Sequence, residues 1–214
     1  MIQPLLSRED LPISLRMNLQ RLERLGPTQQ LPLGTPERII AELNVPESAT
    51  VAVFGGGPDV FAAAFADHIS LHGTVYSFEL SDELSSGGMA HRPPEWTSRG
   101  YLKMRHKENG RVPLSDECVD LVVWAFVLRT LGHVSGMLDE TRRILRPGGR
   151  IAVADWIRQD EVSGPRRDER VSAATCERCL AAAGFGLIGQ RALNKSHYIV
   201  VGRRPVGLAG MRTA

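Results

Sequence analysis

The segment VAVFGGGPDVF, residues 51–61, limits the possible folds more than any other part of the chain. An apolar run leads into three glycines, Gly55, Gly56 and Gly57, and then into a second apolar stretch. Glycine allows positive φ and lets the backbone approach a ligand closely, so this layout is typical of a strand, turn and helix that hold a nucleotide-like cofactor. The segment therefore predicts an α/β domain with a binding site in its first strand–helix unit.

Segments of strand length and helix length alternate along the rest of the chain. We expect strands at 50–55, 74–80, 101–106, 118–127, 150–156, 185–193 and 196–204. We expect helices at 35–43, 59–73, 134–149 and 171–184, the third of them stopped by Pro147-Gly148-Gly149. The run at 118–127 is apolar almost throughout, as is typical of a central parallel strand. This alternation predicts a doubly wound α/β sheet with a mainly parallel core.

Composition excludes several classes of protein. The 214 residues, 43% of them hydrophobic, suffice for one sizeable core and favour one domain. The net charge of +2 does not predict a nucleic acid or an anionic membrane as partner. No run of about 18 apolar residues occurs, and the N-terminus lacks the apolar core of a signal peptide. We therefore expect a cytoplasmic protein.

The chain divides into three parts. Residues 1–35 are rich in Pro, Leu and Arg, and their leucine spacing predicts a helical N-terminal extension. This extension either packs on the domain or covers a substrate pocket as a lid. Residues 36–203 form the expected domain, and residues 204–214 are expected to be a flexible tail.

An acid ends the second expected strand. Glu79 follows Gly57 by about 20 residues, the spacing at which a strand-end carboxylate accepts hydrogen bonds from both ribose hydroxyls. Ribose occurs in both NAD and S-adenosylmethionine. This feature alone therefore does not separate an oxidoreductase from a methyltransferase.

The segment 108–156 resembles the class I S-adenosylmethionine-dependent methyltransferases, above all the small-molecule branch of quinone and arsenite methyltransferases. The resemblance lies in VPLSDECVDLV before and within the fourth strand, ETRRILRPGGRI before the fifth, and GTVYSFELSDEL around the second. More weakly, it extends over residues 36–203. It implies a Rossmann-like, seven-stranded, mainly parallel sheet with an antiparallel last strand. It also implies S-adenosylmethionine as cofactor and methyl transfer to a small-molecule acceptor.

The resemblance assigns cofactor roles to particular residues. Gly55 and Gly57 pass under the methionine part, and Glu79 binds ribose. Glu108 takes the adenine amino group, while the Asn109 backbone N–H faces a ring nitrogen; these roles suit the donors and acceptors involved. The full predicted cofactor-binding set is Gly55, Gly56, Gly57, Asp59, Glu79, Leu80, Glu108 and Asn109.

The sequence departs from the family pattern in the first glycine motif and after the fourth strand. Val53 stands where the family commonly has an acid, and Asp59 where it has its last glycine. Asp59 either stabilises the start of the helix or receives the methionine ammonium. Arg129 and Thr130 replace the histidines of many relatives, and arginine cannot act as a general base.

These departures leave two functions open: a working methyltransferase, or a catalytically inactive methyltransferase-like accessory or ligand-binding protein with a protein partner. A nicotinamide oxidoreductase is a third alternative. It does not explain the resemblance of residues 108–156.

The expected acceptor side also resembles a group of short bacterial relatives with a DW-x-x-x-E-x-x-GP signature. The matching residues are Asp155, Trp156, Glu161, Gly164, Pro165, Arg170, His197 and Tyr198. Asp155 is a candidate to steer or deprotonate the nucleophile, or else caps the following loop. His197 is a candidate base, with a structural role as the alternative. Arg170 either belongs to a solvated loop or holds an anionic substrate.

Cysteine and histidine spacing predicts no metal site. Cys176 and Cys179 form a single C-x-x-C within an expected helix, which favours two side chains on a helix face over a redox pair. Cys118 flanks a strand. Because the cysteines form no visible thiolate cluster, arsenic methylation is not favoured.

Overall fold

The computed structural model describes residues 35–55, 60–69, 72–79, 101–105, 111–129, 134–160 and 164–206. The N-terminal extension predicted for residues 1–35 lies almost wholly outside these ranges, as does most of the predicted tail. The helix expected at 35–43 is confirmed as α2 (Thr35–Leu43). Within the described residues, no helix is long and apolar enough to cross a membrane.

The described strands lie in one sheet in the order β3-β2-β1-β4-β5-β7-β6. Their bounds are β1 (Thr50–Gly55), β2 (Thr74–Glu79), β3 (Tyr101–Arg105), β4 (Val119–Ala125), β5 (Leu145–Trp156), β6 (Gly186–Ala192) and β7 (His197–Arg203). Pairings from β3 through β5 are parallel, whereas β7 runs antiparallel to both β5 and β6. The predicted α/β fold with a mainly parallel sheet is confirmed.

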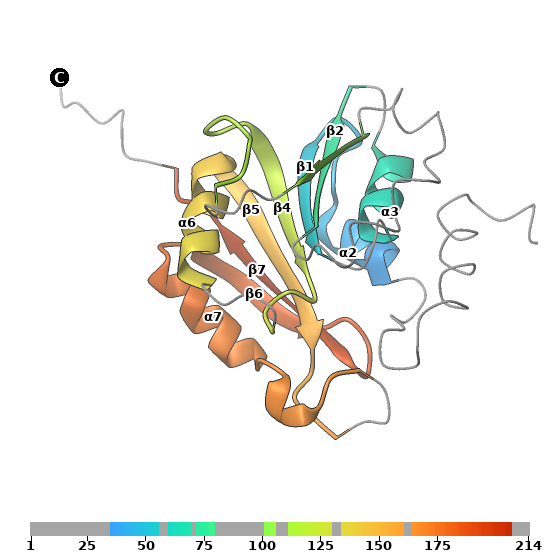
Figure 1. Cartoon of the computed structure of the whole chain (residues 1–214), viewed down its shortest axis with the longest axis vertical. Helices are drawn as coiled ribbons and strands as arrows, with labels where there is room; N and C mark the ends of the chain where they lie inside the picture. The colour runs from blue at the N-terminus through green and yellow to red at the C-terminus, as the bar shows by residue number, and fades with distance from the viewer. Residues whose placement is uncertain are drawn as a thin grey trace, which may run out of the picture.

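Helices cover both faces of the sheet (Figure 1). Helices α2 and α3 (Val60–His68) lie on one face, and α6 (Val134–Ile144) and α7 (Ala173–Ala182) lie on the other. Each face has its own buried hydrophobic cluster, because side chains that alternate along a strand point to opposite sides. Strand β4 is apolar on both sides because it is covered on both sides; among its residues only Asp120 is not buried.

Capping and side-chain bonds fix helices α6 and α7. Ser172 caps α7, its hydroxyl accepting a hydrogen bond from the Thr175 N–H at 3.2 Å. The buried residues of α6 are Met137, Leu138, Thr141 and Ile144. The Thr141 hydroxyl accepts a hydrogen bond from the Trp124 indole N–H at 3.2 Å, which ties α6 to β4.

Three predicted boundaries are wrong. Helix α6 ends at Ile144, before the Pro-Gly-Gly sequence, and β5 begins at Leu145 rather than at residue 150. The β4–β5 pairing is irregular here, since Val119 faces Leu145 and Leu121 faces Arg150, so the extra residues are absorbed as a distortion of the strand. Helix α3 ends at His68 rather than Gly73, with the His68 ring Nε2 2.6 Å from the Val45 carbonyl oxygen.

Candidate functional site

The sheet order places a candidate site at the carboxyl ends of the central strands. The chain runs outward from β1 through β2 to β3, then returns to β4 on the other side of β1 and continues to β5. In such a sheet, ligands bind at the carboxyl ends where the direction reverses. Gly55, Glu79 and Asp155 lie at the carboxyl ends of β1, β2 and β5, respectively.

Gly55 is required by the packing at the end of β1. Its φ is +73°, a conformation that side-chain-bearing residues rarely adopt. A Cβ added here would lie 2.2 Å from the Val127 Cγ1 and 2.7 Å from the Ala125 carbonyl oxygen. The glycine thus lets the end of β1 pass close to the end of β4. Gly56, Gly57 and Asp59 lie outside the described residues.

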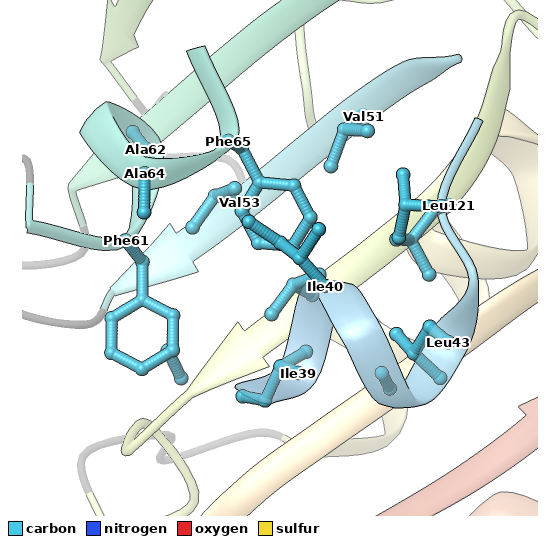
Figure 2. Close-up of a cluster of buried hydrophobic side chains, with 14 of the residues drawn as sticks. Ile39, Ile40, Leu43, Val51, Val53, Phe61, Ala62, Ala64, Phe65 and Leu121 are labelled. Atoms are coloured by element: carbon cyan, nitrogen blue, oxygen red, sulfur yellow. The ribbon is translucent and has the colours of Figure 1, made fainter. Parts of the chain in front are cut away.

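Val53 occupies a dry position in the hydrophobic cluster between β1 and helices α2 and α3 (Figure 2). Its side chain is fully buried, in the same cluster as Phe61, Phe65 and Ile39. A carboxylate in this position would carry a large desolvation cost unless it were paired. The departure from the family pattern at Val53 therefore agrees with its surroundings, and the strand predicted at 50–55 is confirmed.

The ends of β1 and β2 are held side by side. Phe54 pairs in register with Phe78, and their rings stack with centroids 4.7 Å apart. Glu79 is the next residue of β2 and pairs with Arg105 of β3. The backbone therefore brings Glu79 to the strand end beside Gly55. The other predicted cofactor residues of this half, Leu80, Glu108 and Asn109, lie outside the described residues.

Asp155 is buried and its carboxylate is bonded to backbone. One oxygen accepts a hydrogen bond from the Leu128 N–H at 3.2 Å, and the other accepts from its neighbour, the Trp156 N–H, at 2.7 Å. Burial raises the pKa of Asp155 to about 6, against the opposing effect of these bonds and of the charges on Arg129 and Arg170. The carboxylate therefore ties Leu128, which follows β4, to the last residue of β5.

His197 is enclosed by aromatic rings. Its side chain is fully buried, and its Nδ1 lies 3.1 Å from the Asn194 side-chain nitrogen. The ring packs edge-on against Trp156 and Phe126, with centroids 4.3 and 4.8 Å away. These contacts describe a packing role for His197.

Phe126 was missed by sequence reasoning. It follows β4 directly and adopts φ +57°, which is strained for a bulky side chain. Its N–H donates to the Ala154 carbonyl at 2.9 Å, and its ring contacts Phe61, Trp156 and His197. Such a conformation leaves no mark in the sequence, because phenylalanine is not a residue that usually occupies it.

Arg170 is not a solvated loop residue. It is 4% exposed, and its guanidinium donates to the carbonyls of Pro165 and Ile157, both at 2.9 Å. The guanidinium carbon lies 5.0 Å from the centre of the Trp156 ring. The possibility that Arg170 reaches out to an anionic substrate does not fit this buried position.

The cysteines lie in two places: Cys118 is just before β4, and Cys176 and Cys179 are in α7. Cys118 precedes β4, at the opposite end of the sheet from Asp155. Cys176 is buried in α7, and burial raises the pKa of its thiol to about 12, so it is a poor thiolate donor. Within the described ranges, no three His, Cys, Asp or Glu side chains are grouped so that they could hold a metal ion.

Part of the chain matches known proteins of one family. A family model described as a methyltransferase domain matches residues 53–153, which run from β1 to β5. The ubiquinone/menaquinone biosynthesis C-methyltransferase of Cupriavidus metallidurans is 29% identical over 118 residues, covering 55% of this chain and 47% of that protein. The part of the chain from β1 to β5 thus resembles the S-adenosylmethionine-dependent methyltransferases.

A second relative of this chain is the arsenite methyltransferase of Halobacterium salinarum. It is 30% identical over 103 residues, covering 48% of this chain and 25% of that protein. The chain thus spans about half the length, or less, of these relatives. The predicted resemblance to the small-molecule methyltransferases, with S-adenosylmethionine as their cofactor, is confirmed, and neither comparison favours the alternative of an inactive accessory protein.

Solved structures support the fold. A methyltransferase from Aquifex aeolicus, described as S-adenosylmethionine-dependent, superposes with a TM-score of 0.74 at 20% identity, covering 87% of this chain and 98% of that one. The [4+2]-cyclase SpnF superposes with a TM-score of 0.67 at 14% identity, covering 80% of each chain. The second match illustrates that this fold alone does not determine the reaction.

Proposed function

We propose that this protein transfers the methyl group of S-adenosylmethionine to a small-molecule acceptor. The observation that supports this best is the juxtaposition of Gly55 and Glu79 at neighbouring strand ends, within the region 53–153 that matches the methyltransferase domain. The Gly55 turn leaves the backbone open to close approach, and a strand-end carboxylate accepts hydrogen bonds from ribose hydroxyls. The Gly55 backbone fits the methionine part of S-adenosylmethionine, and the Glu79 carboxylate fits its ribose.

The remaining cofactor roles follow from the family resemblance. Gly56 and Gly57 continue the turn under the methionine part, and Asp59 receives its ammonium at the start of α3. Leu80 follows Glu79 beside the ribose. Glu108 accepts from the adenine amino group, while the Asn109 N–H donates to the ring.

The chemistry requires alignment and exclusion of water more than acid–base catalysis. Held by Gly55 and Glu79, S-adenosylmethionine would supply an activated methyl group to an electron pair of the acceptor and would leave as S-adenosylhomocysteine, with the acceptor proton passing to water. The residues of this chain bind and orient the two partners. Asp155, whose carboxylate accepts from the Leu128 and Trp156 N–H groups, steers the nucleophile from the end of β5, and His197 packs beside it on Trp156.

Quinol acceptors are the first class to test, because two of the similar relatives are named for quinone methylation. Arsenite is a weaker candidate, since Cys118 and the buried Cys176 lie in different parts of the described structure. We place the reaction in a cytoplasmic domain formed by residues 36–203 on a seven-stranded sheet. Residues 1–35 serve as an extension and residues 204–214 as a tail. No nucleic acid or membrane takes part.

Calorimetric titration with S-adenosylmethionine and S-adenosylhomocysteine tests the proposal. We expect micromolar binding, about −8 kcal/mol, that is lost in Glu79→Ala. Glu37→Ala is the matched control, because Glu37 is an exposed acid on α2 and its removal should leave binding unchanged. A folded wild-type protein that binds neither compound would reject the enzyme and favour the accessory protein with a protein partner.

A further inference from the structure

Residues that are scattered in the sequence form one cluster at the carboxyl end of β5. Asp155 pairs in register with Tyr198, and Trp156 pairs with His197. The Tyr198 hydroxyl donates to the Val171 carbonyl at 3.0 Å, one residue after Arg170. The structure thus gathers most of the short signature noted in the sequence: Asp155, Trp156, Gly164, Pro165, Arg170, His197 and Tyr198.

Arg170 ties together both ends of the segment that follows β5. Its two carbonyl partners belong to Ile157, the first residue after the strand, and to Pro165. A guanidinium presents its N–H groups in a rigid planar fork, so two such bonds fix two carbonyls relative to each other. Burying the cation is costly, and these charge-assisted bonds offset that cost only while the loop keeps this shape.

Gly164 closes the same segment against the Trp156 ring. Its φ is +83°, and a Cβ added to it would lie 2.7 Å from two ring atoms of Trp156. The backbone at Gly164 therefore packs directly on the indole. Trp156 is itself only 5% exposed, so it acts as a fixed support beneath the loop.

The neighbouring loop after β4 is tied to the same support. Asp155 holds the Leu128 N–H, and Phe126 packs its ring on Trp156 with centroids 5.9 Å apart. The loops after β4 and β5 therefore share one rigid base. Because the cofactor residues are assigned to the ends of β1 and β2, the ends of β4 and β5 form the other side of the site, where an acceptor meets the methyl group.

We propose that Arg170 is a positioning residue for the methyl-acceptor side, holding residues 157 and 165 in place through the carbonyls of Ile157 and Pro165 and through the ring of Trp156. This assignment rests on the proposed function. It differs from a purely stabilising role in one measurable respect. A positioning residue affects the acceptor selectively, whereas a stabilising clamp affects only unfolding.

The test compares Arg170→Gln and Arg170→Lys with the wild type, using a naphthohydroquinone as probe acceptor. S-adenosylhomocysteine affinity is measured by calorimetry. Probe binding to the S-adenosylhomocysteine complex is followed by ¹⁹F NMR of 5-fluorotryptophan-labelled protein, with the Trp156 resonance assigned from Trp156→Phe. Arg167→Gln is the control, because Arg167 is an exposed arginine of the same region, paired with Asp160 at 3.3 Å.

In the wild type, we expect the probe to move the Trp156 resonance. Arg170→Gln should weaken probe binding by about tenfold or more while S-adenosylhomocysteine affinity changes by less than about twofold. Arg170→Lys should restore only part of the loss, because a lysine lacks the planar fork. Arg167→Gln should behave as the wild type.

Three results would overturn the assignment: equal probe affinity in Arg170→Gln and wild type, a parallel loss of probe and S-adenosylhomocysteine affinity, or no response of the wild-type Trp156 resonance to the probe. Failure of the proposed function is a separate result, because the wild-type protein would then bind no S-adenosylhomocysteine at all.

Discussion

Polar clusters lie at both ends of strands β4 and β5, and they satisfy their charges differently. At the amino ends, Arg143 pairs with Glu140 and Asp116 at 2.8 and 2.6 Å. The hydrogen bond with Glu140 raises the pKa of Arg143. Partial burial acts to raise the pKa of Glu140, but the hydrogen bond and the charge of Arg143 lower it. At the carboxyl ends, Asp155 and Arg170 are each buried, and the hydrogen bonds described for them go to backbone groups.

The two clusters therefore differ in role: the amino-end cluster stabilises the fold, whereas the carboxyl-end cluster positions loops. In the amino-end cluster, acid and base neutralise each other, and the remaining bonds from Arg143 to the Val112 and Leu114 carbonyls hold a loop that water also reaches. In the carboxyl-end cluster, the Asp155 carboxylate and the Arg170 guanidinium both bind peptide groups at loop ends. A buried polar group left without its partner is costly, so this end tolerates only one loop geometry.

The largest expected effect comes from closing the space at Gly164. Gly164→Ala places a methyl group against the Trp156 ring and forces a side chain into positive φ, so we expect a loss of about 2–4 kcal/mol in the free energy of unfolding. Urea denaturation measures this loss. Gly136→Ala is the matched control, because Gly136 lies within α6 and an added Cβ meets nothing.

Gly136→Ala should stabilise the protein by about 0.4–1 kcal/mol, through the reduced freedom of the unfolded chain. If Gly164→Ala proved as harmless as this control, the carboxyl-end loop would be adaptable, and the contrast between the two ends would not hold.

Hydrophobic patterning predicted the sheet well because burial leaves a direct mark on the sequence. The all-apolar run around β4 and the alternation of strands and helices were sufficient to predict the covered, mainly parallel sheet. The boundary at Ile144 was missed because the Pro-Gly-Gly sequence is compatible with an irregular strand as well as with a helix stop. Pairing with β4 decided between these alternatives, and such pairing is not a local property.

The candidate site was only partly predictable. Gly55 and Glu79 could be placed at strand ends from spacing alone, since a strand end is a local feature. The role of Arg170 could not be predicted, because RRDER is typical of a solvated loop and the two carbonyls that bury its guanidinium are defined only in three dimensions. The strained conformation of Phe126 likewise depends on tertiary packing around Trp156.

A smaller effect, on the order of 2 kcal/mol, is expected from the ionisation of Asp155. Its pKa is about 6 in the folded protein, mainly because of burial, compared with an ordinary value of 3.8. The folded state therefore binds this proton more tightly than the unfolded state does. The stability contributed by this group is greatest below about pH 4 and falls as the pH rises to about 6.

Asp155→Asn removes this titration. The difference in unfolding free energy between wild type and Asp155→Asn should therefore shift in favour of the variant between pH 4 and pH 7, as measured by urea denaturation at both values. Other titrating groups cancel in this difference. A difference that does not change with pH would show that Asp155 is not a desolvated carboxylate, and the carboxyl-end cluster would resemble the amino-end one.

The smallest effect is expected at the amino end. Arg143→Gln should cost about 1–2 kcal/mol, because the guanidinium is lost from two carbonyls and two carboxylates that water can partly reach. Arg146→Gln is the matched control: its ion pair with Asp120 is half-exposed, so its loss should cost less than about 1 kcal/mol. Both variants should bind S-adenosylhomocysteine and the probe acceptor as the wild type does. If Arg143→Gln weakened probe binding as strongly as Arg170→Gln does, the two ends of β4 and β5 would be coupled. They would then act as one positioning system rather than as separate supports for stability and for the acceptor.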